Sequence, residues 1–184
     1  MIPTLPLALR NRLTAVILSA LHDGEARREL ARLGSPETPL PADWPAGPDS
    51  GLLRERARRA SEALEERPLA GAEALPEALE AAAALFDAHL YFEVHEILED
   101  PWRRATGEER EALQGLIQVA VRLQHLANGN LAGARALLEE GGARLGRGRL
   151  AGVDVRPFAR AVAVIRVGTE MDWTTVPSFP RSRI

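Results

Sequence analysis

The sequence contains no cysteine and no lysine, and it is poor in aromatic residues. The lack of cysteine excludes disulfides, thiolate nucleophiles and zinc sites built on cysteine. All 23 basic residues are arginines, so Schiff-base chemistry on a lysine is excluded as well. Aromatic residues make up only 4% of the chain, which disfavours β-strands, whose pleated surfaces are rich in aromatic and β-branched side chains.

What remains is a composition typical of helices, rich in Ala, Leu, Glu and Arg. Apolar residues account for 46% and charged residues for 27%, which indicates a folded globular protein. The net charge of −3 points to neither nucleic acid nor acidic lipid as a partner. The apolar run 13–21 is too short to cross a bilayer, so we interpret it as part of an amphipathic helix and expect a cytoplasmic protein.

The chain divides by composition into three regions. Residues 1–71 form an N-terminal helical extension that contains a proline-rich linker over 34–51, where we expect Trp44 to attach the linker to the core. Residues 72–168 form the core, and residues 169–184 form an extended, partly loose C-terminal tail. The expected fold is all-α, a compact helical bundle of about five to seven helices with an N-terminal helical arm.

Caps and prolines set the expected helix boundaries. Pro76 favours the start of one long helix over 77–100, which Pro101 ends. Thr106 and Glu109 form a candidate capping box for the next helix, which runs to about Ala127. Further helices are expected over residues 5–33 with a break at 22–24, and over 52–67, 131–140 and 155–167.

The unusual polar residues of the chain gather in the segment 86–130. His95 and Glu99 are four residues apart and therefore lie one above the other on a helix. Gln114, Gln118 and His125 share one line on the following helix, which is otherwise apolar. Because a short turn makes the two helices antiparallel neighbours, we expect these three side chains to face His95 and Glu99.

This cluster has two interpretations. In the first, His95, Glu99 and His125 bind a divalent metal ion, and Glu96 or Glu93 acts as general base, as in the zincin pattern His-Glu-x-x-His. The amides of Gln114 and Gln118 and the indole of Trp102 would then line the binding site. In the second, His95 and Glu99 are a buried ion pair whose hydrogen-bonding shell fixes the register of the helices.

The same stretch resembles a known family. The run 91–99 (YFEVHEILE) followed by Trp102, the run 105–110 (ATGEER), the run 113–118 (LQGLIQ), His125 and Gly129-Asn130 are similar to domain-of-unknown-function family 309, small all-helical bacterial proteins. The similarity extends from about residue 75 to about residue 166. It implies a compact helical bundle and carries the label "predicted metal-dependent hydrolase". The family pattern commonly has Gly where this chain has His89.

Whether the protein is an enzyme is left open by the sequence. The first hypothesis is a metal-dependent hydrolase, and the alternative is a non-enzymatic helical module that binds a small molecule or a protein. A nucleic-acid-binding role for the arginine-rich C-terminal part ranks third, because no interleaved aromatic residues or reading motif accompany the arginines. A homo-oligomer is compatible with either of the first two hypotheses.

Overall fold

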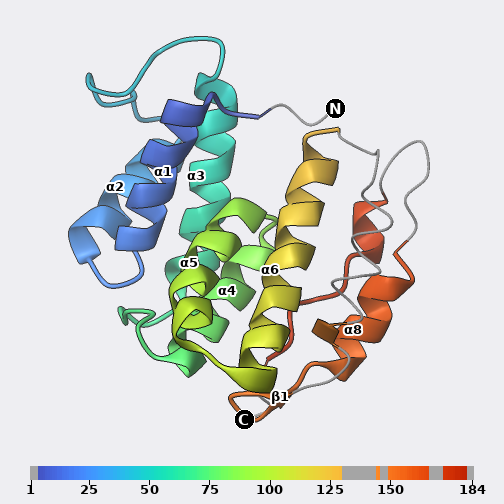
Figure 1. Ribbon diagram of the computed structural model, residues 1–184. Helices are drawn as coiled ribbons and strands as arrows, with labels where there is room; N and C mark the ends of the chain where they lie inside the picture. Colours follow the sequence, from blue (N-terminus) through green and yellow to red (C-terminus); the bar gives the residue numbers. More distant parts are fainter. Residues whose placement is uncertain (1–3, 130–143, 146–148, 166–171, 182–184) are drawn as a thin grey trace. The chain divides into compact units, whose positions relative to one another are not determined.

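A computed structural model describes residues 4–129, 144–145, 149–165 and 172–181. Within these residues the chain forms seven α-helices, one short 3₁₀ helix and a two-stranded sheet, so the all-α prediction is confirmed (Figure 1). The chain divides into two compact units, Pro3–Gly71 and Ala72–Ile184. None of the described helices is both long enough and apolar enough to cross a membrane.

The N-terminal unit is built from three helices that pack against one another. They are α1 (Leu7–Ser19), α2 (Gly24–Gly34) and α3 (Ser50–Glu65), and their buried side chains are mainly leucines, such as Leu13, Leu30 and Leu53. The carboxylate of Asp23 accepts a hydrogen bond of 2.8 Å from the Glu25 amide, which caps the start of α2.

Two further features tie this unit together. A Cβ atom on Gly34 would lie 2.7 Å from backbone atoms of Arg58, so only glycine lets the end of α2 approach α3 this closely. The proline-rich segment is anchored by Trp44, whose ring is buried and whose Nε1 donates a 3.2 Å hydrogen bond to Glu29. Trp44 is thus an anchor, as expected, but it attaches the segment to α2 of the same unit.

The second unit is organised around three consecutive helices, α4 (Leu75–Asp87), α5 (Tyr91–Arg104) and α6 (Gly107–Ala127). Helix α5 packs against both neighbours. A hairpin of two residues per strand follows, β1 (Arg149–Leu150) and β2 (Val153–Asp154), in which Arg149 pairs with Asp154. Helix α8 (Arg156–Ala163) and the 3₁₀ helix η1 (Trp173–Thr175) complete the described chain.

The prediction of one long helix over 77–100 is wrong. The chain leaves the helix after Asp87, because His89 adopts a left-handed backbone conformation with φ of 59°. The His89 amide bonds to the carbonyl of Phe86 (2.9 Å) and the Leu90 amide to that of Leu85 (2.8 Å). These two bonds form a Schellman motif, which usually has glycine at the position of His89. The glycine implied by the family resemblance is thereby explained.

The expected stop at Pro101 is also wrong, since α5 continues for one turn to Arg104. Proline removes one backbone donor but does not forbid a final turn. That turn is capped from α6, where Arg110 Nη1 donates to the carbonyl of Trp102 at 2.9 Å. Thr106 does precede α6, but its side chain makes no capping hydrogen bond, so the predicted capping box is absent there.

Residues 172–181, the described part of the C-terminal tail that was predicted to be extended and partly loose, pack against α4 and α8. Phe179 is buried against Phe86 and Phe158, with ring centroids 5.3 and 5.9 Å away. The carboxylate of Asp87 accepts hydrogen bonds from the Phe179 amide at 2.9 Å and from Arg181 at 2.7 Å. The tail thus closes over the end of α4. The helix predicted over 131–140 lies outside the described residues.

Candidate functional site

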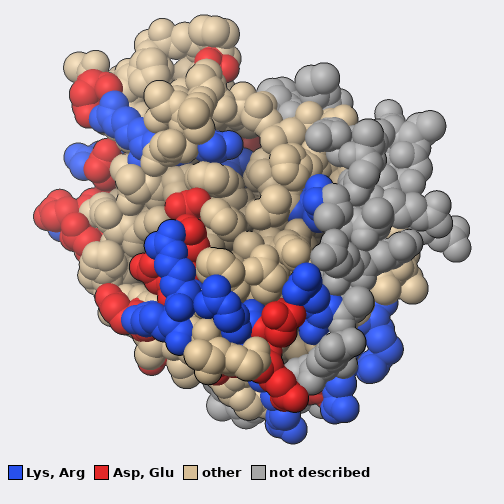
Figure 2. All heavy atoms as spheres, viewed as in Figure 1, with Lys and Arg blue, Asp and Glu red and all other residues tan. Residues whose placement is uncertain are grey.

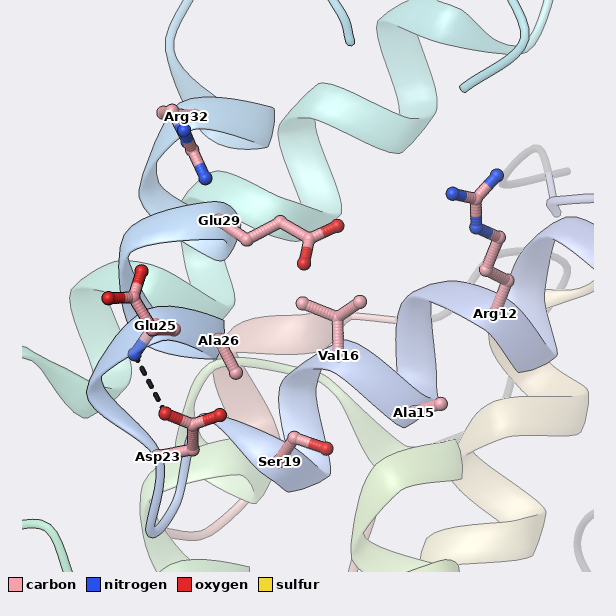
Figure 3. Close-up of a pocket in the computed structure, with 9 residues that line it drawn as sticks. All are labelled: Arg12, Ala15, Val16, Ser19, Asp23, Glu25, Ala26, Glu29 and Arg32. Atoms are coloured by element: carbon pink, nitrogen blue, oxygen red, sulfur yellow. Dashed lines mark hydrogen bonds between the residues drawn. The ribbon is translucent and has the colours of Figure 1, made fainter. Parts of the chain in front are cut away.

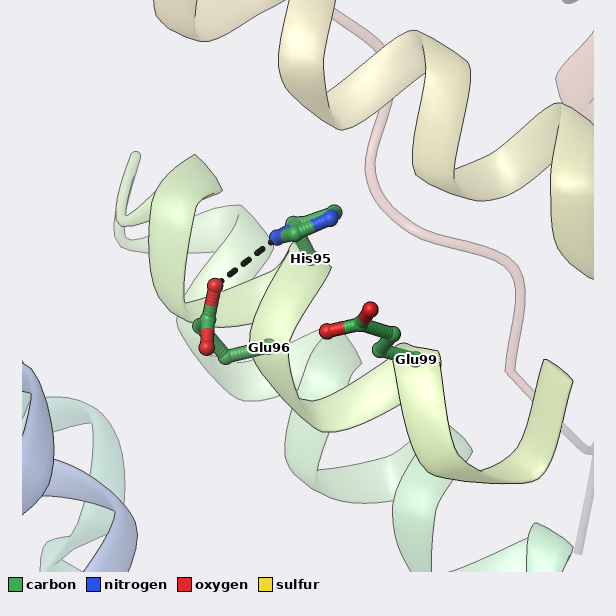
Figure 4. Close-up of side chains that lie close together, drawn as sticks. All are labelled: His95, Glu96 and Glu99. Atoms are coloured by element: carbon green, nitrogen blue, oxygen red, sulfur yellow. Dashed lines mark hydrogen bonds and ion pairs between the residues drawn. The ribbon is translucent and has the colours of Figure 1, made fainter. Parts of the chain in front are cut away.

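The polar side chains of α5 come together on one turn of the helix. His95, Glu96 and Glu99 each offer a ligand atom, and these atoms lie within 4.8 Å of one another (Figure 4). All three residues are half-buried, which leaves the group in contact with water. Among the described residues, this is the group of histidine and acidic side chains whose ligand atoms are close enough together to hold one metal ion.

His95 and Glu96 form the closest contact in the group. The distance between His95 Nδ1 and Glu96 Oε1 is 2.9 Å, and their side chains are 30% and 33% exposed. An ionised carboxylate can only accept, so Nδ1 carries the proton in this contact. In the neutral imidazole the second ring nitrogen, Nε2, keeps its lone pair, and it points away from Glu96 (Figure 4). This arrangement orients an imidazole for metal binding through Nε2.

Glu99 has a partner of its own in the next turn. Its carboxylate accepts a 2.6 Å hydrogen bond from Arg103, in an ion pair whose two side chains are 32% and 60% exposed. Arg103 also contacts Asp100 at 3.3 Å. Figure 2 shows acidic and basic side chains lying side by side on the face that carries α5 and α6. Such exposed pairs are worth about 1 kcal/mol or less, so a cation could displace Arg103 from Glu99 at small cost.

The structure differs from the expected ligand set at the third position. His125 is exposed near the end of α6, seven residues or about 10 Å beyond Gln118, and it does not belong to the group. The residue that joins His95 and Glu99 is Glu96, which we had expected to be a general base. Neighbouring residues on a helix point about 100° apart. Here the long glutamate side chain bends back toward the imidazole.

The other predicted residues lie around this group in different environments. Glu93 is fully buried and does not belong to the group of His95, Glu96 and Glu99, called here the metal-type group. Water therefore does not reach Glu93 as it reaches Glu96. Gln114 and Gln118 are half-buried on α6, and Gln118 Oε1 is a buried acceptor without a hydrogen-bond partner in the described part of the chain. The sequence had led us to expect hydrogen bonds from His95 and Glu99 to the amides of α6. In the structure His95 bonds to Glu96, and Glu99 bonds to Arg103.

Trp102 is placed as a structural residue. The guanidinium of Arg110 lies 4.2 Å from the centre of its ring, in a cation–π contact. The same arginine caps the carbonyls at the end of α5, at distances of 2.9 to 3.4 Å. Trp102 and Arg110 therefore hold the turn between α5 and α6 in place.

Comparison with known proteins supports the family resemblance. Residues 79–137 match the sequence model of a family described as a domain of unknown function (DUF309). The match includes most of α4 and all of α5 and α6, and so it contains His95, Glu96 and Glu99. The resemblance predicted from the sequence is confirmed for this segment, which is about a third of the chain. Searches of curated proteins and of solved structures find no match.

Proposed function

We propose that His95, Glu96 and Glu99 bind a divalent metal ion and that the protein is a metal-dependent hydrolase. The proposal is carried by one observation, the presence of an imidazole and two carboxylates within 4.8 Å on a half-exposed turn of α5. Imidazole nitrogen and carboxylate oxygen are ligands suited to Zn²⁺, Mn²⁺ or Fe²⁺. Three protein ligands on one open surface leave a position for water or substrate.

Each residue has a defined part in this proposal. Glu99 supplies a carboxylate oxygen once Arg103 is displaced, and His95 supplies Nε2. Glu96 supplies the second carboxylate oxygen once its hydrogen bond to His95 Nδ1 is broken. When bound, a divalent ion would polarise a substrate oxygen and lower the pKa of a water molecule in the open position.

The first test is metal binding by the full chain. Calorimetric titration of metal-free protein with Zn²⁺ and with Mn²⁺ should show one site, and His95→Ala and Glu99→Gln should abolish it. Asp100→Asn is the matched control, because Asp100 is an exposed acid on the same helix that lies outside the group. Failure of the wild-type protein to bind either ion refutes the metal site.

The second test is catalysis. Metal-loaded protein is assayed against carboxylic-ester, amide and phosphoester substrates, with metal-free protein and His95→Ala as controls. Activity that follows metal occupancy supports a hydrolase. Tight metal binding without hydrolysis of any of these substrate classes would retain the site and reject the enzyme.

A second candidate function is a non-enzymatic helical binding module, in which the same polar cluster is structural. It is favoured by the fact that His95 and Glu99 already have partners, Glu96 and Arg103. Because His95 and Glu96 are about one-third exposed, a purely structural role predicts that His95→Ala lowers the free energy of unfolding by about 1 kcal/mol or less. Unchanged thermal stability of the wild-type protein on adding metal would favour this module.

A further inference from the structure

Charged side chains around the groove between α1 and α2 hold the N-terminal unit together. This groove has a volume of about 410 Å³ (Figure 3). On its wall the Asp23 carboxylate accepts the hydrogen bond from the Glu25 amide that caps α2, and Glu29 accepts one from Trp44. These contacts are structural. The ion pair of Arg103 in the second unit differs from them, because metal binding to the metal-type group would break it.

Arg103 ends at an oxygen of the metal-type group. Its Nη2 donates to Glu99 Oε1 at 2.6 Å, and Glu99 is a proposed ligand. The Arg103 side chain is 60% exposed, so it can leave Glu99 without being drawn out of a packed interior. A cation on Glu99 therefore releases the Nη2 donor of Arg103 at the edge of the site.

Asp100 keeps the released guanidinium close to the site. Its Oδ1 accepts a 3.3 Å hydrogen bond from Nη1 of Arg103, which is not the nitrogen that donates to Glu99. Asp100 is 78% exposed and does not belong to the metal-type group, so a metal ion leaves this contact in place. Because the guanidinium is a rigid planar fork, a contact at Nη1 keeps Nη2 directed toward the site.

Metal binding also changes the sign of the charge on this half of α5. Residues 95–104 contain three carboxylates and two arginines, which is a net charge of −1 with His95 neutral. A divalent ion changes this charge to +1. The last carbonyls of the helix, which would repel an anion, accept hydrogen bonds from Arg110. An anion is therefore disfavoured in the metal-free protein and attracted once the ion is bound.

We infer that the substrates of this site are phosphoesters and that Arg103 binds their phosphoryl oxygens. The inference rests on the proposed metal-dependent hydrolase. A phosphoryl group has several charged oxygens, so a guanidinium and a divalent ion can share it, and charge-assisted hydrogen bonds from arginine to phosphate are strong. Carboxylic esters and amides are neutral and offer the guanidinium no negative charge.

The reaction is hydrolysis of a phosphorus–oxygen bond. The oxygen of a water molecule bonds to phosphorus, the bond from phosphorus to the leaving oxygen breaks, and one proton of the water is transferred to that oxygen. The products are an alcohol and a phosphate with one ester bond fewer. Arg103 binds the charged phosphoryl oxygens without gaining or losing a proton, because a guanidinium stays protonated in proteins.

The test measures the affinity of the full chain for inorganic phosphate by calorimetric titration, with the protein loaded with the more tightly bound of Mn²⁺ and Zn²⁺. Wild-type protein should bind phosphate only when the ion is present. Arg103→Ala removes a charge-assisted hydrogen bond and should raise the phosphate Kd by about tenfold or more. The same change should tighten binding of the ion, because the competing ion pair is lost. Opposite responses of the two affinities to one substitution distinguish this role from a structural one.

Two further variants make the comparison specific. Arg104→Ala is the matched control, because Arg104 carries the same charge at the next position but bonds to the Glu73 carbonyl, and it should change the phosphate Kd by no more than about twofold. Arg103→Lys keeps the charge without the planar fork, so its phosphate Kd should lie between those of wild type and Arg103→Ala. Circular dichroism checks that each variant is folded. If Arg103→Ala does not fold, Arg103→Lys decides, and a phosphate Kd equal to that of wild type overturns the inference.

The outcomes separate this inference from the proposed function. Failure of wild-type protein to bind Mn²⁺ or Zn²⁺ refutes the metal site, and the inference with it. Metal binding without phosphate binding overturns the inference alone, as do equal phosphate affinities in Arg103→Ala and Arg104→Ala or phosphate binding by metal-free protein. Metal-dependent hydrolysis of carboxylic esters or amides, with no hydrolysis of phosphoesters, retains the enzyme and rejects the substrate class.

Discussion

Replacement of Arg103 by alanine is the most direct probe of the group formed by His95, Glu96 and Glu99, because Arg103 forms an ion pair with the proposed ligand Glu99. The ion pair between them has a distance of 2.6 Å and is partly exposed, with 60% of the Arg103 side chain and 32% of the Glu99 side chain accessible. A metal ion that binds Glu99 must first break this pair. The pair therefore opposes metal binding by the free energy that it contributes to the metal-free protein.

The size of the effect follows from the exposure. Exposed ion pairs contribute about 0.2 to 1 kcal/mol, and 1 kcal/mol corresponds to about a fivefold change in a dissociation constant. Arg103→Ala should therefore tighten binding of Zn²⁺ or Mn²⁺ by up to about fivefold. The same change should lower the stability of metal-free protein by no more than about 1 kcal/mol.

Calorimetric titration of both proteins at two salt concentrations measures this difference. Arg104→Ala is the matched control, since Arg104 is the next residue, is exposed, and donates to the Glu73 carbonyl rather than to Glu99. Both variants remove one positive charge close to the site, so their long-range effect on a cation is similar. The excess tightening in Arg103→Ala isolates the ion pair. Equal affinities in the two variants, or weaker binding in Arg103→Ala, would refute Glu99 as the ligand.

Three further predictions concern the fold. His89→Gly should be more stable than His89→Ala by about 1 kcal/mol in chemical denaturation, because both lose the imidazole but only alanine keeps a Cβ atom at φ of 59°. Gly34→Ala should destabilise the protein by about 1 to 3 kcal/mol, since its Cβ would lie 2.7 Å from the backbone of Arg58. Hydrogen bonds from the Arg156 side chain and amide hold the pKa of Asp154 well below its ordinary value of 3.8. The stability that ionised Asp154 contributes should thus be present above pH 3.8 and lost in stronger acid. The measurement is the free energy of unfolding of wild type and of Asp154→Asn as a function of pH.

For each of these predictions there is a result that would contradict it. Equal stability of the two His89 variants would show that the left-handed conformation carries no strain. Gly51→Ala is the control for Gly34, because nothing lies within 4 Å of the added Cβ on α3, and it should be neutral or stabilising. If the difference in unfolding free energy between Asp154→Asn and wild type stays constant down to strong acid, ionised Asp154 does not stabilise the fold.

Local sequence signals determined much of this protein. The excess of Ala, Leu, Glu and Arg predicted the all-α fold, and the motif around His95 predicted the family match. The extent of α6 followed from Thr106 before it and the turn residues after Ala127. These features depend on neighbours in the sequence, through helix propensity, helix periodicity and the groups that can precede or follow a helix.

Other features were decided by the tertiary structure. The residues next to His89 did not mark it as left-handed. In the structure this conformation is accompanied by contacts of the side chain: Nδ1 lies 2.8 Å from the Tyr91 hydroxyl, and the ring packs against Trp173. Pro101 stays inside α5 because Arg110 of the next helix caps the final turn. Likewise Glu96, not His125, completes the metal-type group, since the reach of a side chain and the offset between packed helices decide which polar atoms meet. Helical periodicity gives the face on which a residue lies, but the depth of burial and the partner across a contact depend on how whole helices pack.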